Sequence, residues 1–284
     1  MSPPATWLLT GIPRSGSSLA CRLAGELPDV VALSEPMARS QFAGVTKPSD
    51  ACGRIEDFAV DTWRLVERER RTPSLHVGGR LDDNVVVERS QTGLRRRQAE
   101  HGEIRIDKPL TEGFTLLIKH NALFAALLPH LATSFPCVAL VRNPLVALAS
   151  WQTVDLPVNR GSIPAGEQFD SGLRDALDGT SDVLARQTVI LNWFFAQYGD
   201  NLPPERVLRY EDLVSSGGGT LFDVLGHAGA PSQPLASRND HAVYRQVDIR
   251  GLLDTLVDAG GAWTRFYSRA DCEAAAQRLP GGTA

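Results

Sequence analysis

The segment from Gly11 to Ser18 has the residue types and spacing of a phosphate-binding loop whose lysine is missing. The spacing fits G-x-x-x-x-G-K-[ST] at every fixed position except one, where Ser17 stands instead of lysine. Such a loop directs backbone N–H groups and a helix N-terminus at an anion. In nucleoside triphosphatases the lysine holds the β- and γ-phosphates. Because the fixed cation of this loop is Arg14, the pattern predicts an anionic ligand other than a nucleoside triphosphate.

A second segment, from Val138 to Trp151, places an arginine and a serine where they could bind another phosphate. Arg142 ends an apolar run typical of a buried strand, and Pro144 opens the following helix. Arg142 is therefore expected at the carboxyl edge of a sheet, where open α/β sheets bind ligands. Ser150 follows two helical turns later and could face the same cleft. An arginine fork with a hydroxyl suits a phosphate, so the two segments predict a nucleotide with two separate anionic groups.

Both segments require a scaffold in which strands alternate with helices. Segments that predict strands occur at 7–9, 30–33, 116–119, 138–142 and 206–210. Segments with helical periodicity occur at 17–27, 57–71, 122–131, 145–153, 182–198 and 220–228. This alternation predicts an α/β fold with a P-loop-like parallel sheet flanked by helices on both faces.

Two regions interrupt the alternation. Residues 76–109 are polar, with an alternating segment at 85–87 and a basic run at 95–97, and predict a polar insertion that is either a hairpin or mobile. Residues 157–179 are rich in Gly, Pro and Asp and predict a surface loop. Each region could contact an acceptor, because loops around an α/β sheet commonly supply substrate contacts, or could be a solvated insertion without a role. The sequence has no repeat and no low-complexity linker, so residues 1–284 are predicted to form one domain.

Composition restricts the classes of protein that remain. A net charge of −4 argues against a general nucleic-acid binder. No stretch approaches the roughly 20 apolar residues of a membrane helix, and no signal segment is recognisable, which favours a cytoplasmic protein without a membrane span. Four cysteines lie far apart without a C-x-x-C pair, so neither a metal site nor a redox motif is indicated. Cys21 and Cys137 lie in apolar patterns and are predicted to be buried.

The loop and the strand-to-helix segment together resemble the sulfotransferases that use 3′-phosphoadenosine-5′-phosphosulfate (PAPS). In that family the loop P-R-S-G-[ST]-[ST] holds the 5′-phosphosulfate, and the pattern R-x7-S holds the 3′-phosphate. The matching residues are Pro13, Arg14, Ser15, Gly16, Ser17 and Ser18 for the loop, with Arg142 and Ser150 for the second pattern. The resemblance implies PAPS as co-substrate and in-line transfer of its sulfuryl group, without a metal.

Further segments extend the resemblance along the chain. Residues 208–213 resemble a family strand ending in Y-E-D-[LM], whose tyrosine lies near the nucleotide and corresponds to Tyr210. The alternative for Tyr210 is a ring that packs the strand end. Arg250 and Gly251, followed by residues 261–267, resemble the R-K-G and G-D-W segment that closes over the 3′-phosphate in the cytosolic branch. Ala262 replaces the family's aspartate and the lysine is absent, so a surface role is the alternative for Arg250.

Two residues are candidates for the general base. Residues 27–36 are similar to the branch that includes tyrosylprotein and heparan sulfotransferases, where H-P-D-V precedes a glutamate base, and Glu35 takes that position. A solvated or helix-capping glutamate is the alternative. The cytosolic branch instead uses a histidine in K-T-H, which makes His120 the rival base. Lys119 would stabilise charge on the leaving group, or would be a strand-end lysine that reaches solvent.

The resemblance implies a PAPS-dependent sulfotransferase acting on a hydroxyl or an amine of a small molecule, a glycan or a lipid. A P-loop small-molecule kinase would also explain the loop, but it would leave Arg142 and Ser150 unused. A non-catalytic nucleotide-binding protein on the same fold would tolerate loss of the base. The sequence leaves the acceptor and the oligomeric state open.

Overall fold

A five-stranded parallel sheet forms the centre of the computed structural model, which describes residues 5–84, 86–89, 93–237 and 242–280. Its strands, in spatial order, are β2 (Val30–Ser34), β7 (Thr115–Lys119), β1 (Thr6–Gly11), β8 (Cys137–Val141) and β9 (Val207–Arg209). The predicted α/β fold with a parallel sheet is confirmed. Because all five strands run in one direction, their carboxyl ends meet at one edge of the sheet.

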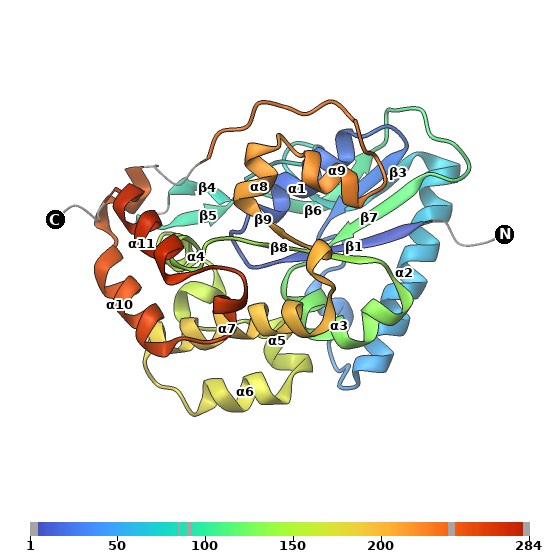
Figure 1. Cartoon of the computed structure of the whole chain (residues 1–284). Coiled ribbons are helices and arrows are strands. Elements are labelled where there is room, and N and C mark those ends of the chain that lie inside the picture. Colours follow the sequence, from blue (N-terminus) through green and yellow to red (C-terminus); the bar gives the residue numbers. More distant parts are fainter. Residues whose placement is uncertain (1–4, 85, 90–92, 238–241, 281–284) are drawn as a thin grey trace.

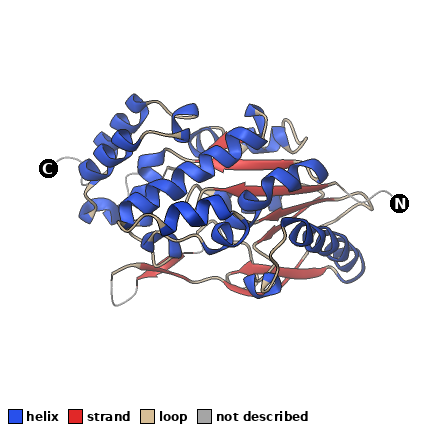
Figure 2. Ribbon diagram, turned by 90° about the horizontal axis from the view of Figure 1, so that it is seen from below, coloured by secondary structure: helices blue, strands red, loops and turns tan. Residues whose placement is uncertain are grey.

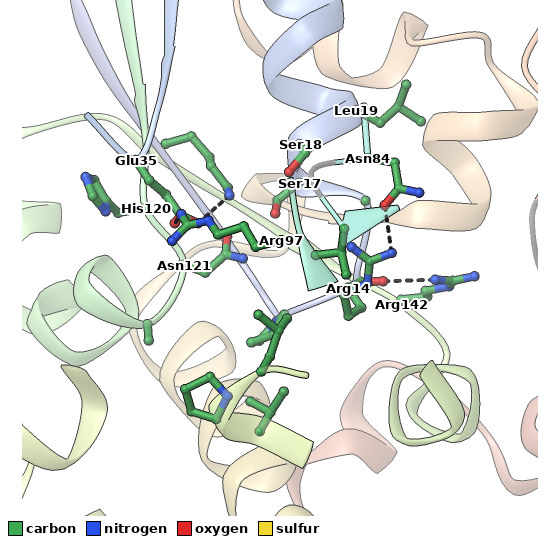
Figure 3. A pocket seen from close by; sticks show the side chains of 18 of the residues that line it. Arg14, Ser17, Ser18, Leu19, Glu35, Asn84, Arg97, His120, Asn121 and Arg142 are labelled. Atoms are coloured by element: carbon green, nitrogen blue, oxygen red, sulfur yellow. Dashed lines mark hydrogen bonds and ion pairs between the residues drawn. The ribbon is translucent and has the colours of Figure 1, made fainter. Parts of the chain in front are cut away.

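Helices cover both faces of this sheet, as Figures 1 and 2 show. Successive strand residues point to opposite faces, so Leu8 joins a large core and Leu9 a smaller one. The smaller core contains α1 (Ser17–Glu26), α8 (Tyr210–Ser215) and α9 (Gly219–Val224). The larger core contains α2 (Pro48–Glu69), α3 (Ala122–Ser134), α4 (Pro144–Trp151), α7 (Val183–Asn201), α10 (Ile249–Ala259) and α11 (Arg269–Arg278). Burial on both faces explains why the strands are continuous apolar runs.

Helix α2 is longer than the sequence predicts. It begins at Pro48 rather than at Asp57, because proline is well suited to the first helical turn and Ala51 and Ile55 already supply a buried face. It ends where Arg70 adopts a left-handed conformation, with φ of 53°. No helix in the described residues is long and apolar enough to cross a membrane.

The surface loop predicted at residues 157–179 is wrong. The segment forms the 3₁₀ helix η2 (Pro157–Arg160) and two short α-helices, α5 (Pro164–Phe169) and α6 (Ser171–Asp178). The side chain of Asp170 caps α6 by accepting a hydrogen bond from the Leu173 N–H, at 2.9 Å. Leu173 and Leu177 are buried. Here Asp and Pro act as helix-start residues rather than as loop residues.

The polar insertion at residues 76–109 forms antiparallel pairs, so the hairpin alternative is confirmed for the part that is described. Strand β4 (Val86–Arg89) pairs with β5 (Arg95–Arg97), and β3 (Arg71–His76) pairs with β6 (Glu100–Arg105). Residue 85 of the predicted alternating segment lies outside the described residues. The basic run is β5, which also forms a bridge to Val154 beyond α4.

All four cysteines are buried and none forms a disulfide. Cys21 lies in α1 and Cys137 in β8, as predicted from their apolar surroundings. Burial raises the pKa of Cys21 to about 12, so its thiol stays protonated at neutral pH.

Candidate active site

A cavity of about 860 Å³ opens at the carboxyl edge of the sheet. The loop after β1, the ends of β2, β7 and β8, and the start of α8 all contribute to its wall. The predicted site residues that line it are Pro13, Arg14, Gly16, Ser17, Ser18, Glu35, Lys119, His120, Arg142 and Tyr210. The meeting of parallel strand ends thus brings together residues that are far apart in the sequence.

The loop after β1 requires glycine at position 16 for two reasons. Gly16 has φ of 90°, a conformation that L-residues rarely adopt. A Cβ there would also lie 2.6 Å from the ring of Tyr210. Helix α1 begins directly afterwards, with no side-chain cap among the described residues and no acidic residue in its first turn. Its first N–H groups and its dipole therefore face the cavity as an anion site.

Two contacts from the far side of the cavity hold this loop in place. Trp151 Nε1 of α4 donates to the carbonyl of Pro13 at 2.8 Å, and Arg142 donates to the carbonyl of Arg14 at 2.9 Å. Arg14 has φ of 70°, and its guanidinium donates to Asn84 Oδ1 at 3.0 Å. The loop is therefore fixed by the strand-to-helix segment that follows β8, while its arginine reaches the insertion.

Arg142 lies over the ring of Tyr210, with 4.5 Å between the guanidinium carbon and the ring centroid. The two residues are 6% and 5% exposed, so the cation is largely removed from water. Tyr210 both lines the cavity and packs the strand end. Ser150 does not line the cavity; it is buried within α4, and its hydroxyl finds no hydrogen-bond partner in the described parts of the chain.

A half-buried carboxylate that the sequence does not single out supports the turn that carries Arg142. Glu211, next to Tyr210, accepts from the N–H of Asn143 at 3.1 Å and from the hydroxyl of Tyr267 at 2.7 Å. The Asn143 side chain caps α4 by accepting from the N–H groups of its first turn. Glu211 thus connects the Y-E-D segment to the turn that carries Arg142.

Glu35 is held at the end of β2 by two cations. Its Oε1 accepts from Lys119 Nζ at 2.7 Å, and its Oε2 accepts from Arg97 of β5 at 2.9 Å. The Glu35 backbone has φ of 42°, and its N–H donates to the carbonyl of Lys119 at 2.7 Å. Lys119 is 2% exposed, so the alternative of a lysine that reaches solvent is wrong.

The surroundings of Glu35 favour its charged form. Burial by itself raises the pKa of a carboxyl group, but Lys119, Arg97 and His120 outweigh burial and lower the pKa of Glu35 to about 2. Its side chain is 29% exposed, so one part of the carboxylate reaches the cavity. At neutral pH Glu35 is therefore an ionised acceptor of protons beside a buried ammonium group.

His120 also lies beside this pair, but its ring is already engaged. Its Nε2 accepts from the N–H of Met37 at 3.3 Å, and its ring meets Phe124 edge to face, with centroids 5.1 Å apart. Burial lowers the pKa of His120 to about 3, although Glu35 opposes this effect. The imidazole is thus neutral at pH 7, with the nitrogen that could accept a proton occupied by Met37.

Besides Ser150, three further residues that the sequence predicts for the site lie apart from the cavity wall. Ser15 is fully buried behind the loop. Arg250 and Gly251 lie at the start of α10, where the Gly251 N–H donates to the capping residue Asp248 at 2.9 Å. Neither lines the cavity, and Arg250 is exposed, so the structure does not bring this pair to the other site residues.

Arg97 and Asn84 are among the cavity residues that the sequence does not predict as part of the site. Both belong to the polar insertion, and each contacts a predicted site residue from a distant part of the chain. The only sequence signal for Arg97 is the basic run at 95–97, which does not predict which of its arginines contacts Glu35. Within the described residues no three His, Cys, Asp or Glu side chains gather as a set of metal ligands.

No protein-family model and no curated protein matches this chain. Among solved structures it is similar to a sulfotransferase from Alicyclobacillus acidocaldarius, with a TM-score of 0.47 and 11% identity over 93% of this chain and 96% of that chain. It is also similar to a sulfotransferase from Mycobacterium tuberculosis H37Rv, with a TM-score of 0.34 and 15% identity over 98% of this chain and 77% of that one. Likenesses of this size assign neither a family nor an activity.

Proposed function

We propose that this chain is a PAPS-dependent sulfotransferase that moves a sulfuryl group from PAPS to an acceptor hydroxyl. One observation carries the proposal: a single cavity holds a lysine-less anion-binding loop, the arginine Arg142, and the ion pair of Glu35 with Lys119. The loop and Arg142 suit a donor with two separate anionic groups. The ion pair of Glu35 with Lys119 suits a reaction step that needs a proton acceptor.

The loop and Arg142 would hold the two ends of the nucleotide. The N–H groups at the start of α1, together with Arg14, would bind the 5′-phosphosulfate. Arg142 would bind the 3′-phosphate, and its contact with the Arg14 carbonyl couples the two subsites. The buried, unpartnered hydroxyl of Ser150 would lie behind Arg142 as a further donor.

In the proposed step the acceptor oxygen attacks sulfur in line with the bond to the 5′-phosphate. The new O–S bond forms, the S–O bond to the phosphate breaks, and its electron pair leaves with the phosphate oxygen. Lys119 has three N–H donors, so it can keep its contact with Glu35 and also donate to that oxygen as negative charge grows there. Positioning and charge stabilisation supply most of the rate, as in phosphoryl transfer.

Glu35 is the proposed general base, ahead of His120. Glu35 is ionised and partly exposed to the cavity, whereas the basic nitrogen of His120 already accepts from Met37. A base must lie within hydrogen-bond reach of the proton it removes. When Lys119 also donates to the leaving oxygen, its positive charge is shared between two anions, which weakens its attraction for Glu35 and raises the proton affinity of the carboxylate.

The test compares two nucleotides by calorimetry and thermal unfolding. The product 3′-phosphoadenosine 5′-phosphate at about 100 times its Kd should stabilise the chain by about 2.7 kcal/mol, and Mg-ATP should not. Stabilisation by Mg-ATP alone would instead establish the kinase alternative. With PAPS and an acceptor, Glu35→Gln should lose turnover while retaining nucleotide affinity. If Glu35→Gln turns over like the unmodified chain, Glu35 is not the base.

A further inference from the structure

We infer that the acceptor is an uncharged apolar hydroxy compound, whose apolar body binds between η1 (Arg39–Phe42), α5 and the start of α3. The inference rests on the proposed function, since it assumes that the hydroxyl is presented to Glu35. It concerns one part of the cavity, which we call the acceptor arm. The acceptor arm is lined by Met37, Phe42, Leu123, Ile163, Ala165 and Phe169.

The acceptor arm begins directly beside the proposed base. Met37 follows Glu35 by two positions, and its N–H is held by His120 at 3.3 Å. Beyond it, Phe42 and Phe169 meet edge to face, with centroids 6.3 Å apart. The arm therefore leads away from the Glu35 carboxylate into a wall of apolar and aromatic side chains.

Few polar groups lie at the acceptor arm. Arg39 of η1 is exposed to solvent, and Asn121 Oδ1, directly before α3, is buried without a hydrogen-bond partner in the described residues. The Gln168 amide donates to the carbonyls of Phe42 and Val45, at 2.8 and 3.0 Å. The carboxylates that line the whole cavity, as far as it is described, are Glu35 and Asp83, and neither belongs to the arm. Asn121 Oδ1 can accept from one hydroxyl, but each further buried hydroxyl of a glycan would lack a partner there, at a cost of about 1–3 kcal/mol. An apolar body incurs no such cost.

The arm is also preformed by local structure. Pro164 opens α5, and Glu167 Oε1 holds its start by accepting from the N–H of Ile163 at 2.6 Å. Phe42 is 2% and Ile163 6% exposed, so these walls are packed from behind. Sites for small apolar ligands are usually preformed in this way, with volumes of roughly 300–1,000 Å³. The cavity of about 860 Å³ lies at the upper end of that range.

Binding and turnover test the inference separately. Binding of 2-naphthol to the full chain is measured by fluorescence with saturating 3′-phosphoadenosine 5′-phosphate. Phe169→Ala should weaken this binding about tenfold, and Ala165→Asp, which adds a charge without removing an aromatic ring, should do the same. Phe135→Ala, at a partly buried phenylalanine outside the cavity, should leave it unchanged. Affinity for the nucleotide should stay the same in all three variants.

Turnover with PAPS is then measured for linear alcohols of increasing length, a glucoside, tyrosine amide and a hydroxycarboxylic acid. For the alcohols kcat/KM should rise roughly fourfold per methylene, which corresponds to about 0.8 kcal/mol. Nucleotide binding without naphthol binding, or faster turnover of the glucoside, the amide or the acid, overturns the inference and leaves the sulfotransferase proposal standing. Naphthol binding that Phe169→Ala weakens, without nucleotide binding, would instead overturn the proposed function.

Discussion

The two arginines proposed to bind the nucleotide, Arg14 and Arg142, have different partners before any ligand binds. Arg14 reaches outward to Asn84 of the insertion, whereas Arg142 is buried over Tyr210 and donates to the loop backbone. Arg142 therefore positions the loop as well as offering a charge. Arg14 can exchange a neutral amide partner for an anion.

Arg14→Ala and Arg142→Ala should each weaken binding of 3′-phosphoadenosine 5′-phosphate by about 1.5–3 kcal/mol, the size of a lost charge-assisted hydrogen bond. Calorimetry measures the change directly. Arg160→Ala is a matched control, because Arg160 is an exposed arginine that pairs with Asp155. An affinity that is unchanged in either cavity variant would remove that arginine from the nucleotide site.

Arg97 affects the pH dependence expected of Glu35. The pKa of Glu35 in the folded chain, about 2, lies below the ordinary glutamate value of 4.5. Its ion pairs therefore stabilise the fold above pH 4.5, and this stabilisation is lost as pH falls from 4.5 toward 2. Glu35→Gln should consequently destabilise the chain more at pH 7 than at pH 3.

Arg97→Gln should raise the pKa of Glu35, since it removes one of the two paired cations. The acidic limb of kcat/KM should then move upward by about one pH unit, while Lys119, His120 and His101 still face the carboxylate. Arg96→Gln, one position away on β5, is the control, because Arg96 lies 3.9 Å from Asp155 instead. Equal pH profiles for the two variants would show that Arg97 does not act on Glu35.

At the scale of elements, the loop after β1 depends on the close approach of the start of α8. Gly16→Ala should both strain the backbone at φ of 90° and push a methyl group into the Tyr210 ring. We expect a loss of stability of about 2–4 kcal/mol and impaired nucleotide binding. Urea unfolding and calorimetry measure the two effects.

Gly44→Ala is the control that separates the effect of backbone strain from the effect of the clash with Tyr210. Gly44 has φ of 73°, but an added Cβ would meet no atom within 4 Å. Gly44→Ala should lower the free energy of unfolding only by the penalty for a left-handed backbone, about 1–2 kcal/mol, and should leave nucleotide affinity unchanged. If both variants behave alike, contact between Gly16 and Tyr210 is not what fixes the loop.

At the scale of the whole molecule, the C-terminal part of the chain supports the carboxyl edge of the sheet. The Tyr267 hydroxyl donates to Glu211, which in turn holds the backbone beside Arg142. Arg209 lies over the Tyr267 ring, with 4.1 Å between the guanidinium carbon and the ring centroid. A segment that lies outside the cavity thus stabilises a turn within it.

Tyr267→Phe should lower the free energy of unfolding by about 1–3 kcal/mol, because it leaves a carboxylate oxygen of Glu211 without its donor while keeping the ring. Urea denaturation measures this change. Tyr244→Phe is the control at another buried tyrosine, for whose hydroxyl no hydrogen bond lies within the described residues. An equal change in the free energy of unfolding for Tyr267→Phe and Tyr244→Phe would exclude a role for the Tyr267 hydrogen bond.

Local patterns predicted much of this molecule. The central strands and most helices follow from apolar periodicity, and the loop from Gly11, Gly16 and their spacing, because such signals depend on near neighbours. The helices at 157–179 were missed since their Asp and Pro caps resemble loop residues in composition. The start of α2 was missed because its polar face hides its periodicity.

The sequence by itself determined the parallel sheet, the lysine-less loop and the strand ends that carry Glu35, Lys119 and Arg142. Only the tertiary structure decided that Arg97 reaches Glu35 across 62 positions of the chain, and that Arg250 lies apart from the cavity. It also decided that α5 forms the wall of the acceptor arm. The physical reason is that periodicity and spacing encode local conformation, whereas a charge pair or a cavity wall depends on how distant elements pack.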